Sequence, residues 1–166
     1  MVRVARGMVW FDGSALRAAR LRAGNEAGWS LDELVRRLRA AGWAGATRQT
    51  LIGYENGTSV PEPARLRVLA MALGTTPAAL SGVAGERARL ADLRHWAGLT
   101  ANQAAGSFGF SRWSLLRVER LGQLPRGWAE SHEGEDGFVQ RAALAYGTTP
   151  QVVDAAWTAV LRSTER

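Results

Sequence analysis

The fold of this chain is decided by the stretch Arg48-Gln49-Thr50-Leu51-Ile52-Gly53-Tyr54-Glu55-Asn56-Gly57, which returns in altered form as Arg112-Trp113-Ser114-Leu115-Leu116-Arg117-Val118-Glu119. Each stretch leads on to the same tetrapeptide, Gly-Thr-Thr-Pro, at positions 74–77 and 147–150. A recurrence in fixed order indicates one unit of structure that is built twice. Two copies are too few for a solenoid, so each copy is predicted to be a small domain with its own core.

The turn that precedes each copy recurs as well, because Ala27-Gly28-Trp29-Ser30 has its counterpart in Ala97-Gly98-Leu99-Thr100. The 166 residues therefore divide into two domains of roughly 70–80 residues each. The predicted segments are an N-terminal arm (1–13), a first domain (14–82) and a second domain (83–166) with an acidic insert (128–137).

Hydrophobic spacing and capping residues predict an all-α fold. Asp12 or Ser14 caps the first helix, and Ser30 caps the second, where Glu33 is expected to complete a capping box. The helices expected in the first copy cover about 15–23, about 31–40, a short stretch from the cap at Thr47 to Asn56, a stretch after Pro63 that ends at Gly74, and Pro77 to about Leu80. Those expected in the second copy cover 87–97, stretches that begin at the caps Thr100 and Ser111, 138–146, and a last helix from Pro150.

The charge of the chain is strongly basic, with a net charge of +6 and a pI near 11.2. Residues 1–82 carry 11 arginines and 6 acids, whereas residues 83–166 carry 10 arginines and 9 acids. Four of those nine acids fall within the insert, which we expect to be a solvated loop that repels DNA. A basic chain favours a polyanionic partner. The absence of lysine is also what codon usage in a GC-rich bacterial genome would produce.

Several classes of protein are not indicated by the sequence. There is no cysteine, so neither disulfides nor thiolate metal sites are expected. No apolar run approaches the roughly 18 residues that span a bilayer, and the start does not resemble a secretion signal. We therefore expect a cytoplasmic, nucleoid-associated protein. His132 among acids is a weak metal signal, so no metal and no cofactor is assigned, and no catalytic residue set stands out.

The order of elements resembles the Cro/C1-type (XRE) helix-turn-helix family. The resemblance rests on the Ser or Thr cap of the second helix, the turn, the capped third helix that ends in glutamate, and the later helix that ends in Leu-Gly or Tyr-Gly. The second copy fits the family spacing without gaps, with Gly109 as the turn, while the first copy has about six extra residues at 39–45. The resemblance implies two tandem lambda-repressor-like domains of about five helices each.

In this family the third helix enters the DNA major groove, and its first turn faces the bases. The resemblance therefore assigns base contacts to Arg48, Gln49 and Thr50, which we expect to be exposed, with Leu51 and Tyr54 buried. Arginine can pair with guanine and glutamine with adenine through two hydrogen bonds. Three further DNA-binding positions of the first copy are predicted: the caps Ser30 and Thr47, and Gly53, whose backbone would approach the DNA closely.

The corresponding DNA-binding positions of the second copy are Arg112, Trp113, Ser114 and Arg117, with the helix caps Thr100 and Ser111. Trp113 is unusual at a groove-facing position. It could contact a thymine methyl group, stack on a sugar or pack against a protein. Both base reading and packing against a protein are therefore open for the second copy.

Positions outside the two reading helices complete the predicted sites. Arg3 and Arg6 could form an arm that reaches the minor groove, although disorder explains them equally well. Glu55 and Glu119 are interpreted as structural, because each can tie its third helix to a neighbouring arginine or to the backbone. His95 is expected to be half-buried.

The preferred function is sequence-specific binding of double-stranded DNA by a transcriptional regulator, most simply a bacterial or mobile-element repressor, with two reading heads in one chain. In one alternative, the first domain binds DNA and the second, through Trp113 and Leu116, is a dimerisation or protein-interaction module. In another, the chain is an antitoxin-like or architectural component whose main ligand is a protein. A homodimer or a regulatory protein partner stays open; an enzyme, a small-molecule effector and a membrane partner are not expected.

Overall fold

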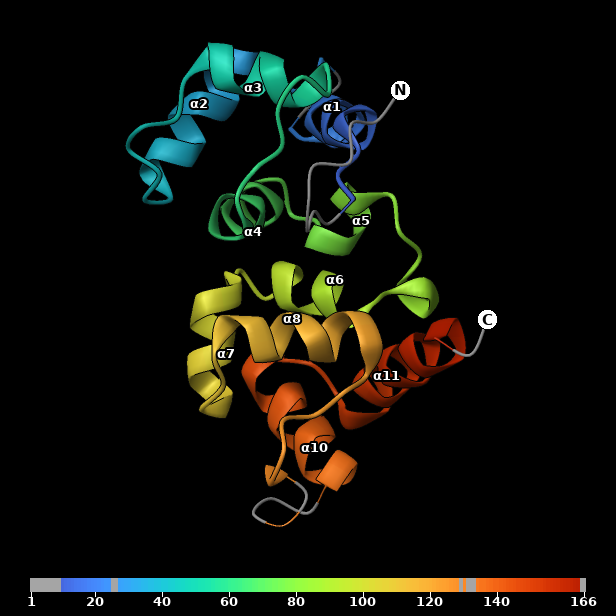
Figure 1. The fold of residues 1–166 in the computed structure, drawn as a ribbon. Coiled ribbons are helices and arrows are strands. Elements are labelled where there is room, and N and C mark those ends of the chain that lie inside the picture. Colours follow the sequence, from blue (N-terminus) through green and yellow to red (C-terminus); the bar gives the residue numbers. More distant parts are fainter. Residues whose placement is uncertain (1–9, 25–26, 129, 131–133, 165–166) are drawn as a thin grey trace. The chain divides into compact units, whose positions relative to one another are not determined.

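The computed structural model describes residues 10–24, 27–128, 130 and 134–164. Throughout this part the regular structure is helical and contains no strand, which confirms the predicted all-α class. The chain separates into two compact units, with the boundary between Ala84 and Gly85 (Figure 1). Each unit is described by itself below.

The first unit is built from short helices that enclose a leucine core. Its helices are α1 (Gly13–Arg22), α2 (Leu31–Ala40), α3 (Arg48–Glu55), α4 (Pro63–Ala72) and α5 (Pro77–Ser81) (Figure 1). Helix α1 packs against α3 and α5, while α2 packs against α3 and α4. The fully buried leucines of this core are Leu16, Leu34, Leu38, Leu51, Leu66, Leu69 and Leu80.

Local capping explains where these helices begin. Asp12, not Ser14, caps α1: its carboxylate accepts hydrogen bonds from the backbone amides of Ser14 (2.8 Å) and Ala15 (3.2 Å). The helix therefore starts at Gly13, two residues earlier than expected. The Ser14 hydroxyl also donates to this carboxylate, and these bonds lower the pKa of Asp12. Thr47 caps α3 as expected, with its hydroxyl oxygen accepting from the Thr50 amide at 3.2 Å.

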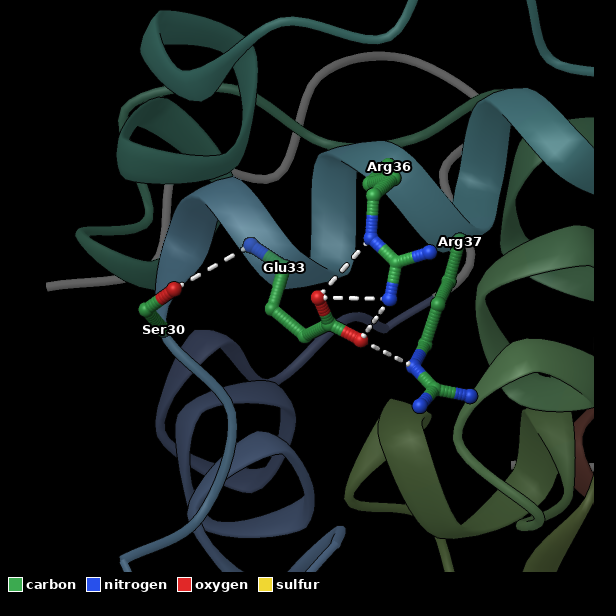
Figure 2. Close-up of polar contacts among 4 residues, drawn as sticks. All are labelled: Ser30, Glu33, Arg36 and Arg37. Carbon is green, nitrogen blue, oxygen red and sulfur yellow. Dashed lines mark hydrogen bonds and ion pairs between the residues drawn. The ribbon is translucent and has the colours of Figure 1, made fainter.

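The start of α2 differs from the expected capping box. Ser30 caps the helix by accepting from the Glu33 amide at 3.1 Å, but the Glu33 carboxylate turns to the guanidinium groups of Arg36 and Arg37 (Figure 2). The shortest of these contacts are 2.6 Å to Arg36 and 2.7 Å to Arg37. Hydrogen bonds between charged groups are stronger than a bond to a neutral amide. The Glu33 carboxylate therefore bonds to the two arginines and not to the Ser30 amide. They lower the pKa of Glu33, Arg36 having the larger effect.

The second unit begins with a single 3-10 turn, η1 (Gly85–Arg87), rather than with the helix expected over 87–97. Its first α-helix starts only at Leu90, where the Asp92 carboxylate accepts from the Arg89 amide at 2.9 Å. The helices of this unit are α6 (Leu90–Trp96), α7 (Ala101–Phe108), α8 (Arg112–Leu121), α10 (Gly134–Tyr146) and α11 (Pro150–Thr164) (Figure 1). Helix α7 packs on α8, and α11 packs on α6, α8 and α10.

The core of the second unit is aromatic, and part of the expected acidic insert belongs to it. Trp128 is only 4% exposed, and its indole nitrogen donates to the Gly134 carbonyl at 2.9 Å. Its ring meets that of Phe110 edge-on, with centroids 4.8 Å apart. Helix α10 already begins at Gly134, four residues before the expected start. The prediction that 128–137 is a solvated loop is therefore wrong at both ends of the segment. His132 and Glu133 lie outside the described residues.

Candidate nucleic-acid interface

A buried ion pair holds the third helix of the first unit in place. The Arg20 guanidinium donates to both carboxylate oxygens of Glu55, at 2.6 and 2.9 Å, and the two side chains are 9% and 8% exposed. A further nitrogen of Arg20 donates to the Trp29 carbonyl at 2.6 Å. One guanidinium thus joins the end of α1, the residue before the α2 cap and the end of α3. The two charges of this pair therefore neutralise each other inside the unit.

The second unit contains the same arrangement. Arg94 donates to both oxygens of Glu119, at 2.6 and 3.2 Å, and to the Leu99 carbonyl at 3.1 Å. The side chains are 6% and 3% exposed. Together, the arginine, the glutamate and the carbonyl before the next helix cap are called the clamp below. The expectation that Glu55 and Glu119 tie their helices to a neighbouring arginine is confirmed in both units.

The turn between the second and third helices differs between the units. The caps Thr100 and Ser111 are 11 positions apart, whereas Ser30 and Thr47 are 17 positions apart. In the second unit, Gly109 makes the turn in the left-handed region at φ 68°, as expected. In the first unit the extra residues lengthen both the helix and the turn. The longer turn is anchored, because Arg39 donates to the Ala46 carbonyl at 3.0 Å and the Ala46 side chain is fully buried.

The first turn of α3 presents two of the three predicted reading residues. Arg48 has a side chain that is 63% exposed, and Gln49 is exposed as well. Thr50 is half-buried instead of exposed, and its hydroxyl lies 2.8 Å from the hydroxyl of the cap Thr47. Leu51 is buried in the core as expected. The structure therefore brings Arg48 and Gln49 to the surface together and leaves Thr50 in a capping role.

Glycine is favoured at position 53 because the chain's own segment 58–59 packs closely against it. A Cβ atom at this position would lie 2.8 Å from the Ser59 hydroxyl oxygen. The Gly53 carbonyl accepts from the backbone amides of Thr58 (2.9 Å) and Ser59 (3.2 Å). The close backbone approach predicted for Gly53 is thus made to the chain's own 58–59 segment, and no DNA contact needs to be invoked for it.

A hollow of about 430 Å³ lies beside Arg48 and adds residues that the sequence pattern alone did not assign. It is lined by Asp32, Val35, Arg36, Arg39, Thr47 and Arg48. Asp32 and Arg48 form an ion pair at 3.7 Å, with side chains 75% and 63% exposed. Such an exposed pair contributes little to stability and is screened by salt. The Arg48 guanidinium can therefore leave Asp32 and bind another anion. Asp32 and Arg36 are four residues apart, so the sequence alone could have placed both on the side of α2 that lines this hollow.

The serine and threonine caps are engaged in capping. The Thr100 hydroxyl accepts from the Gln103 amide at 3.3 Å, and the Gln103 side chain returns a bond to the Thr100 amide at 2.9 Å. The Ser111 hydroxyl accepts from the Ser114 amide at 3.1 Å. Ser30 is used in the same way, as described above. What these helix starts offer to an anion is therefore the backbone amides of the first turn, together with the helix dipole.

The first turn of α8 is more apolar than that of α3. Arg112 is exposed, Trp113 is 72% exposed, and Ser114 is half-buried against the Ser111 hydroxyl. Arg117 is exposed and donates to the Gln123 side chain at 2.7 Å. The exposed surface over the first two turns of α8 therefore combines one indole with two guanidinium groups.

The remaining predicted positions are located as follows. Arg3 and Arg6 lie outside the described residues. His95 is half-buried, as expected, and burial together with the charge of Arg94 lowers its pKa to about 4. Within the described chain, no three His, Asp or Glu side chains gather as a metal site would require. None of the helices described is long and apolar enough to cross a bilayer.

No family model, no curated protein and no solved structure matches this chain. Function must therefore be argued from the geometry given above.

Proposed function

We propose that this chain binds double-stranded DNA in a sequence-specific manner and acts as a transcriptional regulator. The observation that carries the proposal is the first turn of α3, where Arg48 and Gln49 are exposed side by side on a helix whose opposite face is buried. A helix that presents such residues at its start suits the major groove. Arg48 would pair with guanine, and Gln49 with adenine, each discriminating by about 1–3 kcal/mol.

The surroundings of Arg48 support a polyanionic ligand. Arg36 and Arg39 of α2 line the hollow beside it, and Arg36, 72% exposed in its pair with Glu33, would turn from Glu33 to a phosphate while α3 reads the bases. Asp32 is the one acid among these lining residues, and its exposed pair with Arg48 is weak. We infer that Asp32 releases Arg48 when DNA arrives. The phosphate contacts would make binding strongly dependent on salt.

The repeated clamp supports a second reading head in the same chain. In both units, an arginine fixes the end of the third helix to the residue before the second helix. This link makes the third helix rigid, as a surface that reads DNA must be. The resemblance to the Cro/C1-type (XRE) family gives this arrangement its function by analogy. Because the two first turns differ in sequence, the proposed target is asymmetric. A bacterial or mobile-element repressor that works in the cytoplasm, at the nucleoid, is the corresponding biological role.

The proposal is tested by selecting bound duplexes from a random DNA pool with the full chain. Wild type is expected to enrich two distinct sequence blocks. Arg48→Ala is expected to lose one block and to keep the other. Arg22→Ala removes the same charge from the exposed end of α1 and is the matched control, expected to keep both. If wild type enriches no sequence at moderate salt, the proposed function is wrong.

A second candidate is favoured by the 72% exposure of Trp113. In it, the first unit binds DNA while the second unit, through Trp113 and the half-buried Leu116, is a dimerisation or protein-interaction module. Light scattering of wild type and Trp113→Ala separates the two. A dimer that dissociates in the variant, with an unchanged salt dependence of DNA binding, supports this candidate. A monomer in both cases, with weakened DNA binding in the variant, removes it.

A further inference from the structure

Trp113 stands out because a large apolar side chain is left in water at the start of α8. It is 72% exposed, whereas Leu115, two residues later, is fully buried in the core of the unit. The Arg112 guanidinium lies over the indole ring, 5.8 Å from its centroid. In the repeated sequence the same place is taken by Gln49 of the first unit, which is polar and exposed. One exposed indole is not by itself evidence of a contact surface, so the proposal depends on the charged side chains around it.

The charges around Trp113 indicate what kind of surface it contacts. The charged side chains that α8 exposes are Arg112, Arg117 and Arg120, all cationic. Its one acid, Glu119, is buried in the clamp with Arg94. The whole of α7, Ala101–Phe108, carries no charged residue. The face that α7 and α8 present is therefore cationic around one indole, which complements a nucleic-acid duplex.

The chemistry of an indole limits what Trp113 can read there. Its single N–H donor cannot form the paired hydrogen bonds by which arginine or glutamine recognises a base. In the major groove, the feature that an apolar side chain can recognise is the 5-methyl group of a pyrimidine. The cation above the ring keeps the indole oriented by a cation–π contact. Arg112 would then reach a neighbouring phosphate or guanine.

We propose that Trp113 determines the specificity of the second unit by contacting the 5-methyl group of a pyrimidine, either thymine or 5-methylcytosine. This inference rests on the proposed function, because it requires α8 to enter the major groove. It names the chemical group that the second unit recognises.

The test replaces thymines one at a time by uracil in the duplex that wild type selects, and measures affinity by fluorescence anisotropy. Loss of one buried methyl group is expected to weaken binding about fourfold at one position of the second block. Trp113→Gln, which introduces the side chain found at the corresponding place in α3, should bind thymine and uracil duplexes equally. Because Trp113 is exposed, the variant should keep its helical circular dichroism.

A second arm distinguishes the two sources of the methyl group. Cytosines of the same duplex are replaced one at a time by 5-methylcytosine, and a gain of about fourfold that Trp113→Gln abolishes would identify 5-methylcytosine as the natural target. Thymines in the block read by α3 are the matched control, since Trp113→Gln should leave their uracil effect unchanged. If neither substitution changes affinity while a specific duplex is still bound, the inference fails and the proposed function stands. If no specific duplex is found, the proposed function itself fails.

Discussion

Removing one partner of the Arg94–Glu119 clamp is predicted to destabilise the second unit strongly. Glu119→Gln would leave the Arg94 charge buried, at 6% exposure, without its ion-pair partner. Removing one partner of a buried ion pair costs about 3–5 kcal/mol. The amide oxygen of glutamine can still accept one hydrogen bond from Arg94, so we expect the low end of this range, about 3 kcal/mol.

The double variant Arg94→Met/Glu119→Leu separates the charge from the packing. Apolar side chains of similar volume remove both charges of the clamp, but the Leu99 carbonyl loses the bond that Arg94 donates at 3.1 Å. A fully buried carbonyl left without a partner costs about 1–3 kcal/mol, and the half-buried Leu99 carbonyl should cost less, part of which the new apolar contacts offset. The double variant is therefore expected to be more stable than Glu119→Gln.

The free energy of unfolding is measured by urea titration of the full chain, followed by circular dichroism. The two units can unfold separately, so two transitions are fitted. Glu119→Gln should shift one transition and Glu55→Gln the other, because each removes the clamp of its own unit. For a unit of this size, 3 kcal/mol corresponds to a fall in Tm of about 12–24 °C. A cost below about 1 kcal/mol for Glu119→Gln, or a double variant less stable than the single, would refute the reasoning.

Two further predictions concern the backbone and pH. Gly28→Ala would place a Cβ 2.4 Å from the Leu21 carbonyl oxygen, whereas Gly57, at the same φ of 68°, has open space around it. In urea titrations, Gly28→Ala should therefore cost several times the roughly 1 kcal/mol expected for Gly57→Ala, and equal costs would contradict the geometry. The folded-state pKa of His95, about 4, lies below its ordinary value of 6.5, so the folded protein resists the proton that the unfolded chain takes up. The free energy of unfolding should fall by up to about 3 kcal/mol between pH 6.5 and pH 4, and His95→Gln should lack this fall; an identical slope in both proteins would count against the explanation.

The sequence was sufficient where a single local interaction decides the outcome. Thr47, Thr100 and Ser111 cap the helices expected of them, because a hydroxyl three residues before a free amide satisfies it in any context. The role of Glu119 was also within reach, since an acid at the end of a buried helix face needs a cationic partner.

The sequence was insufficient where groups distant in the chain, or several local partners, compete. Glu33 was expected to bond back to the cap, but Arg36 and Arg37 offer it stronger charged donors. Trp128 lies in a stretch rich in acids, so its position in the aromatic core could not be foreseen without the ring of Phe110 against it. Thr50 was expected to be free for DNA, but its hydroxyl meets that of Thr47. The spacing of hydrophobic residues in the sequence does not show which of several possible partners a side chain will contact.

The most direct test of the account is to follow the backbone amide signals of the full chain by NMR while the selected duplex is added. The account predicts that the largest shift changes fall on residues 47–50 and 111–114, the first turns of α3 and α8 with their caps. Changes confined to 47–50 would assign DNA reading to the first unit alone. Changes centred on α10 or α4, with the first turns of α3 and α8 unaffected, would contradict the central claim that these two turns contact DNA.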